Sequence, residues 1–513
     1  MWDEKIEELE ARREKAYNGG GQARIDKQHE KGKLTARERL DVLFDEGTFV
    51  EINSLMESRC IDFGMPKKKI PGDGVVTGYG KVNGRVVFVS SQDFTVGGGA
   101  LGEYHARKIC NAMDMAMDAR APFVEINDSG GARIEEGIDS LNGYALMFRR
   151  HTQMSGVAPQ IAVIMGPCAG GACYAPALCD YIFMTQENGQ MYLTGPKVIK
   201  EVTGEVVTTS ELGGAEVHMN NSGVAHFVYP DDESCLEGVK RLLSYLPENF
   251  EEKAPYVEPV KKYYHKRLRD IVSPNPKVSY DMHEVIEELA DKDTFMEVQS
   301  GFAKNIIVGF MRMEGHTVGV VANQPEFMAG SLDYNAGDKG GRFIRFCDCF
   351  NIPILTLVDV PAFLPGKSQE YNGIIRHGAK LLYAYSEATV PMVTVILRKA
   401  FGGAYIGMDS KGIGADFVFA WPIAQIAVMG AEGAVNIIAK RKIEESEDPE
   451  AARAEAIAEY ENKFMNPYIA ASRGYVDEVI KPDETKERVV KAFDMLSQKN
   501  RVKIPKKHGN MPV

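Results

Sequence analysis

Apolar residues along this chain fall into short runs that alternate with longer amphipathic segments. In the first half the short runs lie at 86–89, 123–126 and 161–165, and the longer segments lie at 103–119 and 135–154. Short apolar runs predict buried strands, whereas apolar residues spaced three and four apart predict helices. Strands that alternate with helices indicate βαβ units, in which helices cover a mainly parallel sheet.

The same order of elements returns in the second half of the chain. Strands are predicted at 317–321, 354–358 and 393–397, and helices at 338–350 and 370–388. The spacing of single residues is kept as well: Pro159 precedes a double glycine by 11 residues, and so does Pro391. The two copies begin 231 residues apart, which is far longer than a solenoid period and indicates two related domains.

The length and composition fit two globular domains. The chain has 513 residues, of which 44% are hydrophobic and 26% charged, and domains of about 250 residues lie within the usual size range. We predict domains at 1–265 and 266–513, because the proline-rich, charged stretch 246–282 has the composition of a linker. The net charge of −12 argues against nucleic acid as a partner, since nonspecific binding needs a basic surface.

The eight cysteines show neither a disulfide framework nor a metal-binding pattern. No Cys-x-x-Cys pair occurs, and no histidine pair lies nearby at zinc-finger spacing. Several cysteines lie inside apolar runs, so we expect buried, reduced thiols and no bound metal. Reduced thiols favour a cytoplasmic protein.

No targeting segment is apparent. The first ten residues are acidic and lack the apolar core of a signal peptide. Residues 161–179 form an apolar stretch long enough to cross a membrane, but its glycines and prolines indicate a buried strand, a turn and the start of a helix. Residues 1–45 are predicted to be charged and helical, with a capping box from Thr35 to Glu38.

The double glycines are the first candidate site. Gly170-Gly171-Ala172 follows one predicted strand, and Gly402-Gly403-Ala404 follows its counterpart in the second half. Small residues at a strand-to-helix turn allow two backbone N–H groups to point at one spot, where the helix dipole helps them to stabilise an oxyanion. Tight packing of a helix on a strand would explain one such pair, but two pairs in register favour oxyanion holes.

The polar segment 127–133, which follows the strand at 123–126, is the second candidate. Ligands of α/β sheets bind beyond the carboxyl ends of strands, so this segment is predicted to be a site loop. Ser129 is a poor candidate for a hydrolytic nucleophile, because its surroundings do not match Gly-x-Ser-x-Gly and the matching segment 359–366 has no serine. A turn that supports an oxyanion is the alternative interpretation.

A glycine run at 97–102 has the spacing of a dinucleotide-binding fingerprint. Residues 90–96 separate it from the preceding strand, and Asp128 lies too far on to be the acidic residue expected about 20 positions later. The second copy has Met328-Ala329-Gly330-Ser331 in this place. We therefore do not predict NAD binding.

Longer stretches around these positions carry a resemblance to a known family. They are 29–39, 91–96, 127–133 and 166–172 in the first half, and 303–309, 323–325, 363–366, 374–381 and 427–433 in the second. With these stretches the chain resembles the carboxyltransferase (β) subunits of biotin-dependent acyl-CoA carboxylases, above all the propionyl-CoA carboxylase type. It is also similar to the α subunits of sodium-pumping methylmalonyl-CoA and glutaconyl-CoA decarboxylases and to the transcarboxylase core subunit.

The resemblance implies an α/β fold of two tandem crotonase-like domains, of the ClpP/crotonase ββα superhelix type. It also implies a homohexamer, a trimer of dimers, whose active sites lie between the N-terminal domain of one subunit and the C-terminal domain of another. The acyl-CoA would lie on the N-terminal domain. Biotin would arrive on a separate carrier protein, since the chain has no Met-Lys-Met biotinylation motif, and coenzyme A would enter as part of the substrate.

The resemblance also assigns roles to residues. Amides around Gly170 and Gly171 would hold the enolate oxygen of the thioester, and amides around Gly403 and Ala404 would hold the oxygen of biotin, whose ureido nitrogen removes the α-proton. The expected substrate-binding residues are Ser129, Gly130, Gly131, Ala132, Ala172, Tyr405 and Ile406. Many propionyl-CoA carboxylases have an aspartate in place of Ile406, and a larger apolar residue there should alter the acyl preference. Conversion of propionyl-CoA to methylmalonyl-CoA is therefore only the leading choice among short-chain substrates.

Other functions stay open at this point. The same site could run the reverse transfer in a sodium-pumping decarboxylase, which would attach the chain to membrane-bound decarboxylase subunits. In the forward direction the expected partner is a biotin carboxylase or biotin carboxyl carrier subunit. A crotonase-type hydrolase or isomerase is disfavoured by the paired glycine turns, and a scaffold for a biotin carrier would bind the carrier without transferring a carboxyl group.

Overall fold

The chain folds into two compact units, each built around its own sheet. The computed structural model describes residues 1–68, 71–260, 268–501 and 504–512. Unit 1 spans Met1–Lys253 and unit 2 spans Ala254–Val513. The predicted domain boundary at 265/266 falls within 261–267, outside the described residues.

The sheet of unit 1 combines an antiparallel hairpin with a parallel core. β1 pairs with β2 and β2 with β3 in antiparallel fashion, and the sheet continues in parallel through β4, β5, β6 and β8, while β7 pairs with the end of β5. The bounds are β1 (Val50–Ile52), β2 (Val75–Val82), β3 (Arg85–Gln92), β4 (Phe123–Ser129), β5 (Gln160–Ala169), β6 (Tyr181–Thr185), β7 (Gln190–Tyr192) and β8 (Phe227–Tyr229). The helical connections between β3, β4 and β5 are the predicted βαβ units.

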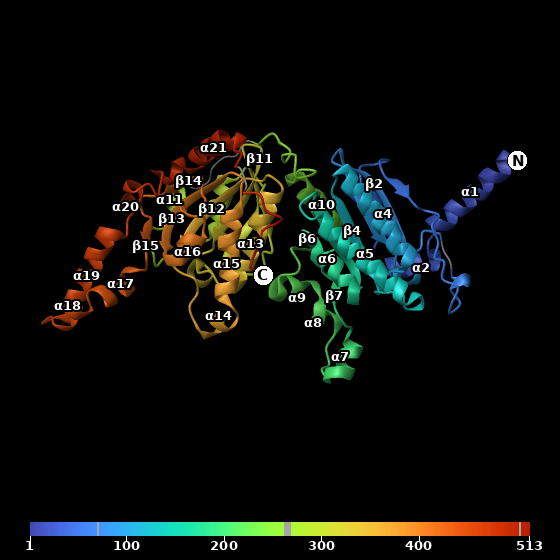
Figure 1. The fold of residues 1–513 in the computed structure, drawn as a ribbon, viewed down its shortest axis with the longest axis horizontal. Coiled ribbons are helices and arrows are strands. Elements are labelled where there is room, and N and C mark those ends of the chain that lie inside the picture. The colour runs from blue at the N-terminus through green and yellow to red at the C-terminus, as the bar shows by residue number, and fades with distance from the viewer. Residues whose placement is uncertain (69–70, 261–267, 502–503, 513) are drawn as a thin grey trace. The chain divides into compact units, whose positions relative to one another are not determined.

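Helices cover both faces of this sheet. The bounds are α1 (Trp2–Tyr17), α2 (Gln22–His29), α3 (Ala36–Leu43), α4 (Glu103–Ala119), α5 (Ile138–Met154), α6 (Tyr174–Leu178), α7 (Pro196–Thr203), α8 (Thr209–Gly213), α9 (Ala215–Val217) and α10 (Asp232–Tyr245). Figure 1 shows α4 and α5 side by side along the sheet. Their apolar stripes pack on it, with Met113, Phe123 and Met147 at most 2% exposed, and each such side chain contributes about 1.5–3 kcal/mol by burial.

Unit 2 repeats this topology. β9, β10 and β11 are antiparallel, the sheet continues in parallel through β12, β13, β14 and β16, and β15 pairs with the end of β13. The bounds are β9 (Met296–Val298), β10 (Ile306–Met313), β11 (His316–Asn323), β12 (Ile354–Val360), β13 (Met392–Phe401), β14 (Phe417–Ala420), β15 (Gln425–Ala427) and β16 (Glu478–Val479). The matching strand order is the structural counterpart of the sequence repeat.

The helices of unit 2 follow the same plan, with α13 and α15 on one face of the sheet. The bounds are α11 (Leu268–Ile271), α12 (Met282–Leu289), α13 (Tyr334–Cys349), α14 (Lys367–Tyr371), α15 (Ile374–Glu387), α16 (Gly402–Gly407), α17 (Ala431–Ile438), α18 (Lys440–Glu444), α19 (Pro449–Phe464), α20 (Pro467–Ser472) and α21 (Thr485–Met495). The prediction of a single helix at 370–388 was wrong, because two helices, α14 and α15, lie there. Gly373 takes a left-handed φ of 78° between α14 and α15, which interrupts the helix.

The apolar stretch 161–179 forms β5, a 3-10 turn at Gly170–Cys173 and α6. This confirms the predicted strand, turn and helix start. Across the described parts of the chain, the structure shows no helix whose length and apolar character would let it cross a membrane.

A buried lysine occupies the same place in both units. Lys108 in α4 donates to two carbonyls of the segment 72–75, at 2.9 and 2.5 Å. Lys339 in α13 donates to carbonyls of the segment 302–306, at 2.8 and 2.8 Å. Burial lowers the pKa of each amine to about 8. Each lysine ties a crossing helix to the residues that lead into a hairpin, so the repeat extends to single hydrogen bonds.

Candidate functional site

The double glycine of unit 1 lies where β5 ends. The strand continues through Ala169, so residues 166–169 belong to the strand and not to the predicted turn. Gly170 then takes a φ of +64°, a conformation that favours glycine. Gly171 is half-buried above the buried Ala172. The backbone of the turn at Gly170 and Gly171 is thus partly exposed.

The predicted site loop lies directly beside this turn. β4 ends at Ser129, whose buried Oγ accepts the N–H of Gly131 at 3.1 Å. Gly131 has a φ of +103°, and a Cβ there would lie 3.1 Å from the carbonyl oxygen of Ala169. Gly130 is exposed and Ala132 is half-buried. The structure therefore brings the two groups predicted in the first half together at the carboxyl edge of the sheet.

The glycine run at 97–99 packs closely against the end of β4, where this loop begins. The turn Gly97–Gly99 has positive φ at all three residues, 60°, 66° and 63°. A Cβ on Gly99 would overlap the Asp128 carbonyl, and a Cβ on its counterpart Gly330 would lie 2.5 Å from the Asp359 carbonyl oxygen. The close approach of two turns thus explains the glycine at this position in both units without a dinucleotide.

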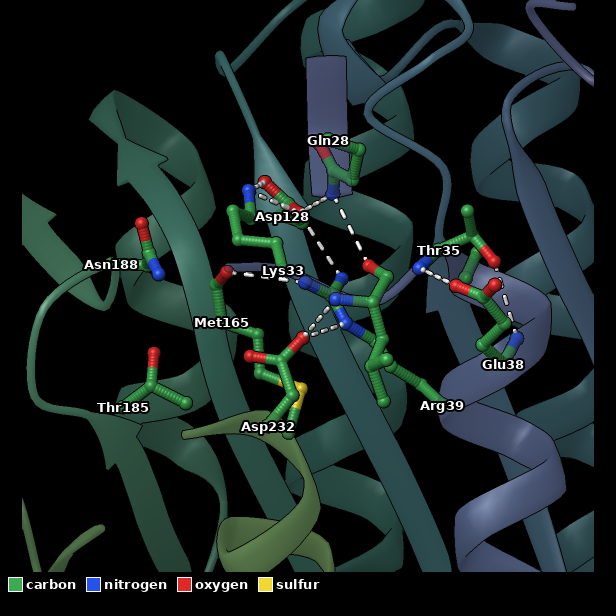
Figure 2. Close-up of polar contacts among 12 residues, drawn as sticks. Gln28, Lys33, Thr35, Glu38, Arg39, Asp128, Met165, Thr185, Asn188 and Asp232 are labelled. Atoms are coloured by element: carbon green, nitrogen blue, oxygen red, sulfur yellow. Dashed lines mark hydrogen bonds and ion pairs between the residues drawn. The ribbon is translucent and has the colours of Figure 1, made fainter. Parts of the chain in front are cut away.

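Asp128 is the centre of a buried ion cluster (Figure 2). Lys33 Nζ lies 2.6 Å from one of its carboxylate oxygens, and Arg39 Nη1 lies 3.1 Å from the same oxygen. Arg39 also contacts Asp232 at 2.8 Å, and Gln28 donates to Asp128 at 3.1 Å. The four charged side chains are at most 4% exposed. Two positive and two negative charges balance one another, so no uncompensated charge is buried.

The cluster anchors the N-terminal segment on the sheet. Burial lowers the pKa of Lys33, and Asp128 counteracts this effect. Burial alone would lower the pKa of Arg39, but Asp128 and Asp232 raise it above its usual value. The predicted capping box starts α3: Thr35 Oγ1 accepts the Glu38 N–H at 3.3 Å, and the Glu38 carboxylate accepts the Thr35 N–H at 2.7 Å. The cap fixes the helical turn that carries Arg39.

Gly166 is required by this cluster. A Cβ at Gly166 would lie 2.5 Å from Asp128 Cγ and 2.8 Å from Lys33 Nζ. Neither partner can move into solvent, because both are buried. The first glycine of the motif 166–172 thus makes room for an ion pair, whereas Gly170 and Gly171 form the turn.

The double glycine of unit 2 has matching geometry. β13 ends at Phe401, and Gly402 begins α16 with a φ of +58°. Gly403 is exposed and Ala404 is buried. The same combination of a left-handed glycine, an accessible glycine and a buried alanine therefore recurs in both units.

The residues that flank this turn are Tyr405, which is half-buried, and Ile406, which is 49% exposed. The Phe363 ring lies close by, 3.9 Å from where a Cβ on Gly403 would stand and 3.1 Å from where one on Gly378 would stand. Glycines thus make room for an aromatic ring beside the turn. The prediction from sequence did not identify Phe363 as a neighbour of Gly403.

A polar cluster lies inside unit 1, between the sheet and α5. His151 Nε2 lies 2.9 Å from a Glu125 oxygen, while its Nδ1 lies 2.8 Å from Gln160 Oε1 and 3.7 Å from Cys179 Sγ. Among the described residues, Glu125, His151 and Cys179 are the group whose ligand atoms are close enough for a metal ion. Glu125 lies at Nε2 of the His151 ring and Cys179 lies at Nδ1, on the opposite side. In this rotamer of His151 the ligand atoms of the three residues therefore do not point toward one ion.

The charge of His151 follows from its two neighbours. Burial alone would lower the pKa of His151, but Cys179 and Glu125 raise it well above its usual value. The eight cysteines form no disulfide, and six of them are buried, so the predicted buried thiols are confirmed at those six positions.

Comparison with known proteins identifies the family to which these two units belong. The model of the carboxyl transferase domain matches residues 27–511. The chain belongs to the carboxyl transferase family. It is therefore a carboxyltransferase.

Relatives of this carboxyl transferase match it over nearly their full length. It is 56% identical to the propionyl-CoA carboxylase carboxyltransferase subunit of Haloferax mediterranei, over 100% of the chain and 99% of the relative. It is also 56% identical to the methylmalonyl-CoA decarboxylase α subunit of Propionigenium modestum, over 99% of both. The transcarboxylase 12S crystal structure, a hexamer with methylmalonyl-CoA bound, matches with a TM-score of 0.97 and 52% identity over 99% of this chain and 98% of that one. These matches confirm the predicted α/β, two-domain crotonase-like fold.

Several residues that lie beside the candidate site escaped prediction from sequence. The stretch 29–39 carried the resemblance, yet its Lys33 and Arg39 had no assigned role. Tyr144, which lies under Gly171, belongs to the buried stripe of α5. The helical periodicity identifies that stripe but not the turn it contacts.

Proposed function

We propose that this carboxyltransferase moves a carboxyl group between carboxybiotin, borne by a separate carrier protein, and a short-chain acyl-CoA. The observation that carries the proposal is the pair of glycine turns at equivalent strand ends of the two units. One reaction with two oxyanions, a thioester enolate and a biotin enolate, needs two such turns. The relatives named for propionyl-CoA and methylmalonyl-CoA support this pair as substrates.

The turn of unit 1 serves the acyl-CoA in this proposal. Amides around Gly170 and Gly171 hold the thioester oxygen while charge develops on it, and a single donor of this kind contributes roughly 3–4 kcal/mol. The segment 129–132 and Ala172 shape the adjacent substrate site. The low bulk at these positions supports the assignment, because a side chain there would occupy the space of the thioester.

The turn of unit 2 serves biotin in the same proposal. Amides around Gly403 and Ala404 would hold the ureido oxygen of biotin as the N–carboxyl bond of carboxybiotin breaks and CO2 is released. Biotin would supply the base, because its freed ureido nitrogen would take the α-proton of the acyl-CoA, and the resulting thioester enolate would attack CO2. Tyr405 and Ile406 lie beside the turn and set the acyl preference. The protein's own contribution is then to hold two oxygens and to exclude water, with no side-chain base.

The direction of transfer is set by the partners. Relatives named as carboxylase and decarboxylase subunits are equally identical to this chain, at 56%, because one site catalyses a reaction and its reverse. We propose a biotin carboxylase or carrier subunit as the partner in the cytoplasm, with decarboxylase subunits as the alternative.

We propose a homohexamer whose active sites join unit 1 of one copy to unit 2 of another. Apolar side chains on the surface support an assembly of copies: Ile134, Ile138 and Leu141 are 89%, 74% and 57% exposed. Ile138 and Leu141 lie three residues apart in α5, on one side of the helix, and Ile134 lies in the 3-10 turn Ile134–Glu136 just before it. An exposed apolar group of this kind marks an interaction surface.

The direct test is carboxyl transfer from methylmalonyl-CoA to free biotin by the purified protein. Gly171→Val and Gly403→Val should each lower the rate by about 100-fold or more while the hexamer persists. Gly412→Val is the matched control, because a Cβ at Gly412 meets nothing within 4 Å. Full activity in either site variant, or no transfer by the wild type, would refute the proposal.

Mixing the two inactive variants tests the shared site. If each site joins two copies, co-expressed Gly171→Val and Gly403→Val chains should recover about a quarter of the wild-type activity, because half of the dimers are mixed and each mixed dimer has one intact site. Mixtures as inactive as the separate variants would show that a single chain supplies both turns.

A further inference from the structure

Phe363 in unit 2 and Ala132 in unit 1 occupy the same place in the repeat. Each forms an isolated parallel bridge with a leucine, Phe363 with Leu332 and Ala132 with Leu101. The flanking hydrogen bonds match as well. In each unit the leucine N–H donates to the carbonyl before the bridged residue, at 3.0 Å in unit 2 and 2.9 Å in unit 1, and the leucine carbonyl accepts the N–H after it, at 2.8 and 2.9 Å. An aromatic ring therefore stands in unit 2 where unit 1 has a methyl group.

Three glycines make room for the Phe363 ring. A Cβ on Gly378 in α15 would lie 3.1 Å from the nearest ring carbon, one on Gly407 would lie 3.4 Å away, and one on Gly403 would lie 3.9 Å away. Gly403 and Gly407 belong to α16, the helix that begins at the glycine turn. The ring thus lies between α15 and the turn, and no side chain at these three positions separates it from either.

The Phe363 ring is also partly accessible. The residue is half-buried, and the neighbouring Gly403 is exposed. In unit 1 the ring beside the corresponding glycine, Gly171, is that of Tyr144, which is only 4% exposed. A ligand at the turn of unit 2 can therefore rest on an aromatic ring, whereas the turn of unit 1 is bordered by the small residues at 130–132.

The two ligands of the proposed reaction match this difference between the units. The bicyclic ring system of biotin is compact and uncharged, and its apolar faces can pack on an aromatic side chain. An acyl-CoA brings a flexible thioester chain, which needs open space beside the turn. The aromatic residue stands on the side to which the proposed function assigns biotin, and the alanine stands on the side of the thioester.

We propose that Phe363 is a specificity-determining residue for biotin, because its ring forms the wall on which the biotin bicycle packs at the turn of unit 2. The two copies of the repeat then differ in ligand at one equivalent position, 363 against 132. This inference rests on the proposed function, since it takes the turn of unit 2 as the biotin side.

The test measures transfer from methylmalonyl-CoA to free biotin, with a separate KM for each substrate and with the melting temperature. Phe363→Ala removes the side chain, whereas Phe363→Leu keeps apolar bulk against Gly378 and removes only the flat ring. Phe417→Ala is the matched control, because Phe417 is another half-buried ring of unit 2. It pairs with Val393 near the start of β13, whereas the glycine turn follows the end of that strand.

We expect the KM for biotin to rise about tenfold in Phe363→Ala and about threefold or more in Phe363→Leu. The KM for methylmalonyl-CoA should stay within about twofold in both, and both KM values should do so in Phe417→Ala. A residue that only fills space would be replaced by leucine at no cost to biotin. Phe363→Leu keeps the packing and should fold, so it is decisive even if Phe363→Ala is unstable.

A KM for biotin within about twofold of the wild type in Phe363→Leu overturns the inference. An equal rise of both KM values overturns it too, because loss of packing alone would affect both substrates. Failure of the proposed function itself would show separately, as full activity of Gly403→Val.

Discussion

Replacement of Gly166 with alanine should damage unit 1 through the ion cluster around Asp128. The new Cβ would lie 2.5 Å from Asp128 Cγ and 2.8 Å from Lys33 Nζ, well inside van der Waals contact. Asp128 and Lys33 are 0% and 4% exposed, so the carboxylate cannot turn toward water. We expect the Lys33–Asp128 contact to break while both charges stay buried.

The expected loss of stability follows from that geometry. Breaking a buried ion pair without removing its charges costs about 3–5 kcal/mol. For a unit of about 250 residues, 1 kcal/mol shifts the melting temperature by roughly 2–4 °C, so the first transition should fall by roughly 6–20 °C. The N-terminal segment, which Lys33 and Arg39 hold on the sheet, should also become more sensitive to protease.

The assay is thermal unfolding followed by calorimetry, which resolves the two units if they melt separately. Gly195→Ala is the matched control in the same unit, because its Cβ would meet only the Tyr192 ring at 3.9 Å and a surface change of this kind costs less than about 0.5 kcal/mol. In an Asp128→Ala background the nearer clash partner is gone and Lys33 has no carboxylate to hold it in place, so adding Gly166→Ala should cost much less than it does in the wild type.

A melting temperature within 2 °C of the control would refute this account of Gly166. It would mean that β5 moves away from the cluster at little cost, and that the glycine is there for another reason. If Gly166→Ala lowered the melting temperature equally in the wild-type and Asp128→Ala backgrounds, this account would also be refuted, because the new Cβ would then clash with other atoms.

Three further predictions concern pH and specificity. Burial lowers the pKa of Lys108 and Lys339 to about 8. Burying each charged amine therefore costs about 3 kcal/mol of stability below pH 8, and this cost should fade as pH rises toward 10.4, where the amine of the unfolded chain also loses its proton. In calorimetric melts, the stability of the wild type relative to Lys108→Met or Lys339→Met should therefore grow between about pH 8 and 10.4. His283 has a pKa raised to about 9, chiefly by its hydrogen bond to Glu297, so His283→Gln should lower the melting temperature most below about pH 6.5 and lose this effect as pH rises through 9; a constant difference would contradict it. Ile406→Asp should lower kcat/KM for ethylmalonyl-CoA relative to methylmalonyl-CoA about tenfold, since one methylene in an apolar contact is worth about 1–3 kcal/mol; an unchanged ratio would contradict it.

Much of the fold could be predicted from periodicity. The helix predicted at 103–119 coincides with α4 (Glu103–Ala119), because its apolar stripe is uninterrupted and no internal glycine or proline breaks it. The strand predicted at 161–165 was too short, since β5 runs to Ala169. Small residues such as Gly166 have low strand propensity, and only the pairing of β5 with β4 and β7 keeps them extended.

The sequence predicted the glycine turns of the candidate site but not the side chains that pack beneath them. The glycine turns are local: a left-handed φ and low bulk are visible in the sequence once two copies are compared. The contacts beneath them are not. Lys33 and Asp128 are 95 residues apart in the chain, and Tyr144 and Gly171 come from different elements. No spacing rule connects such pairs.

The sequence by itself determined the two-fold repeat, the alternation of strands and helices and the places of the glycine turns, because each depends on residues close together in the chain. Only the tertiary structure decided which glycines serve the turn and which make room for Asp128. It also decided that the Tyr144 ring lies against Gly171. These features depend on which surfaces the folded sheet brings together, and the free energy of those long-range contacts belongs to the packed unit and not to any local segment.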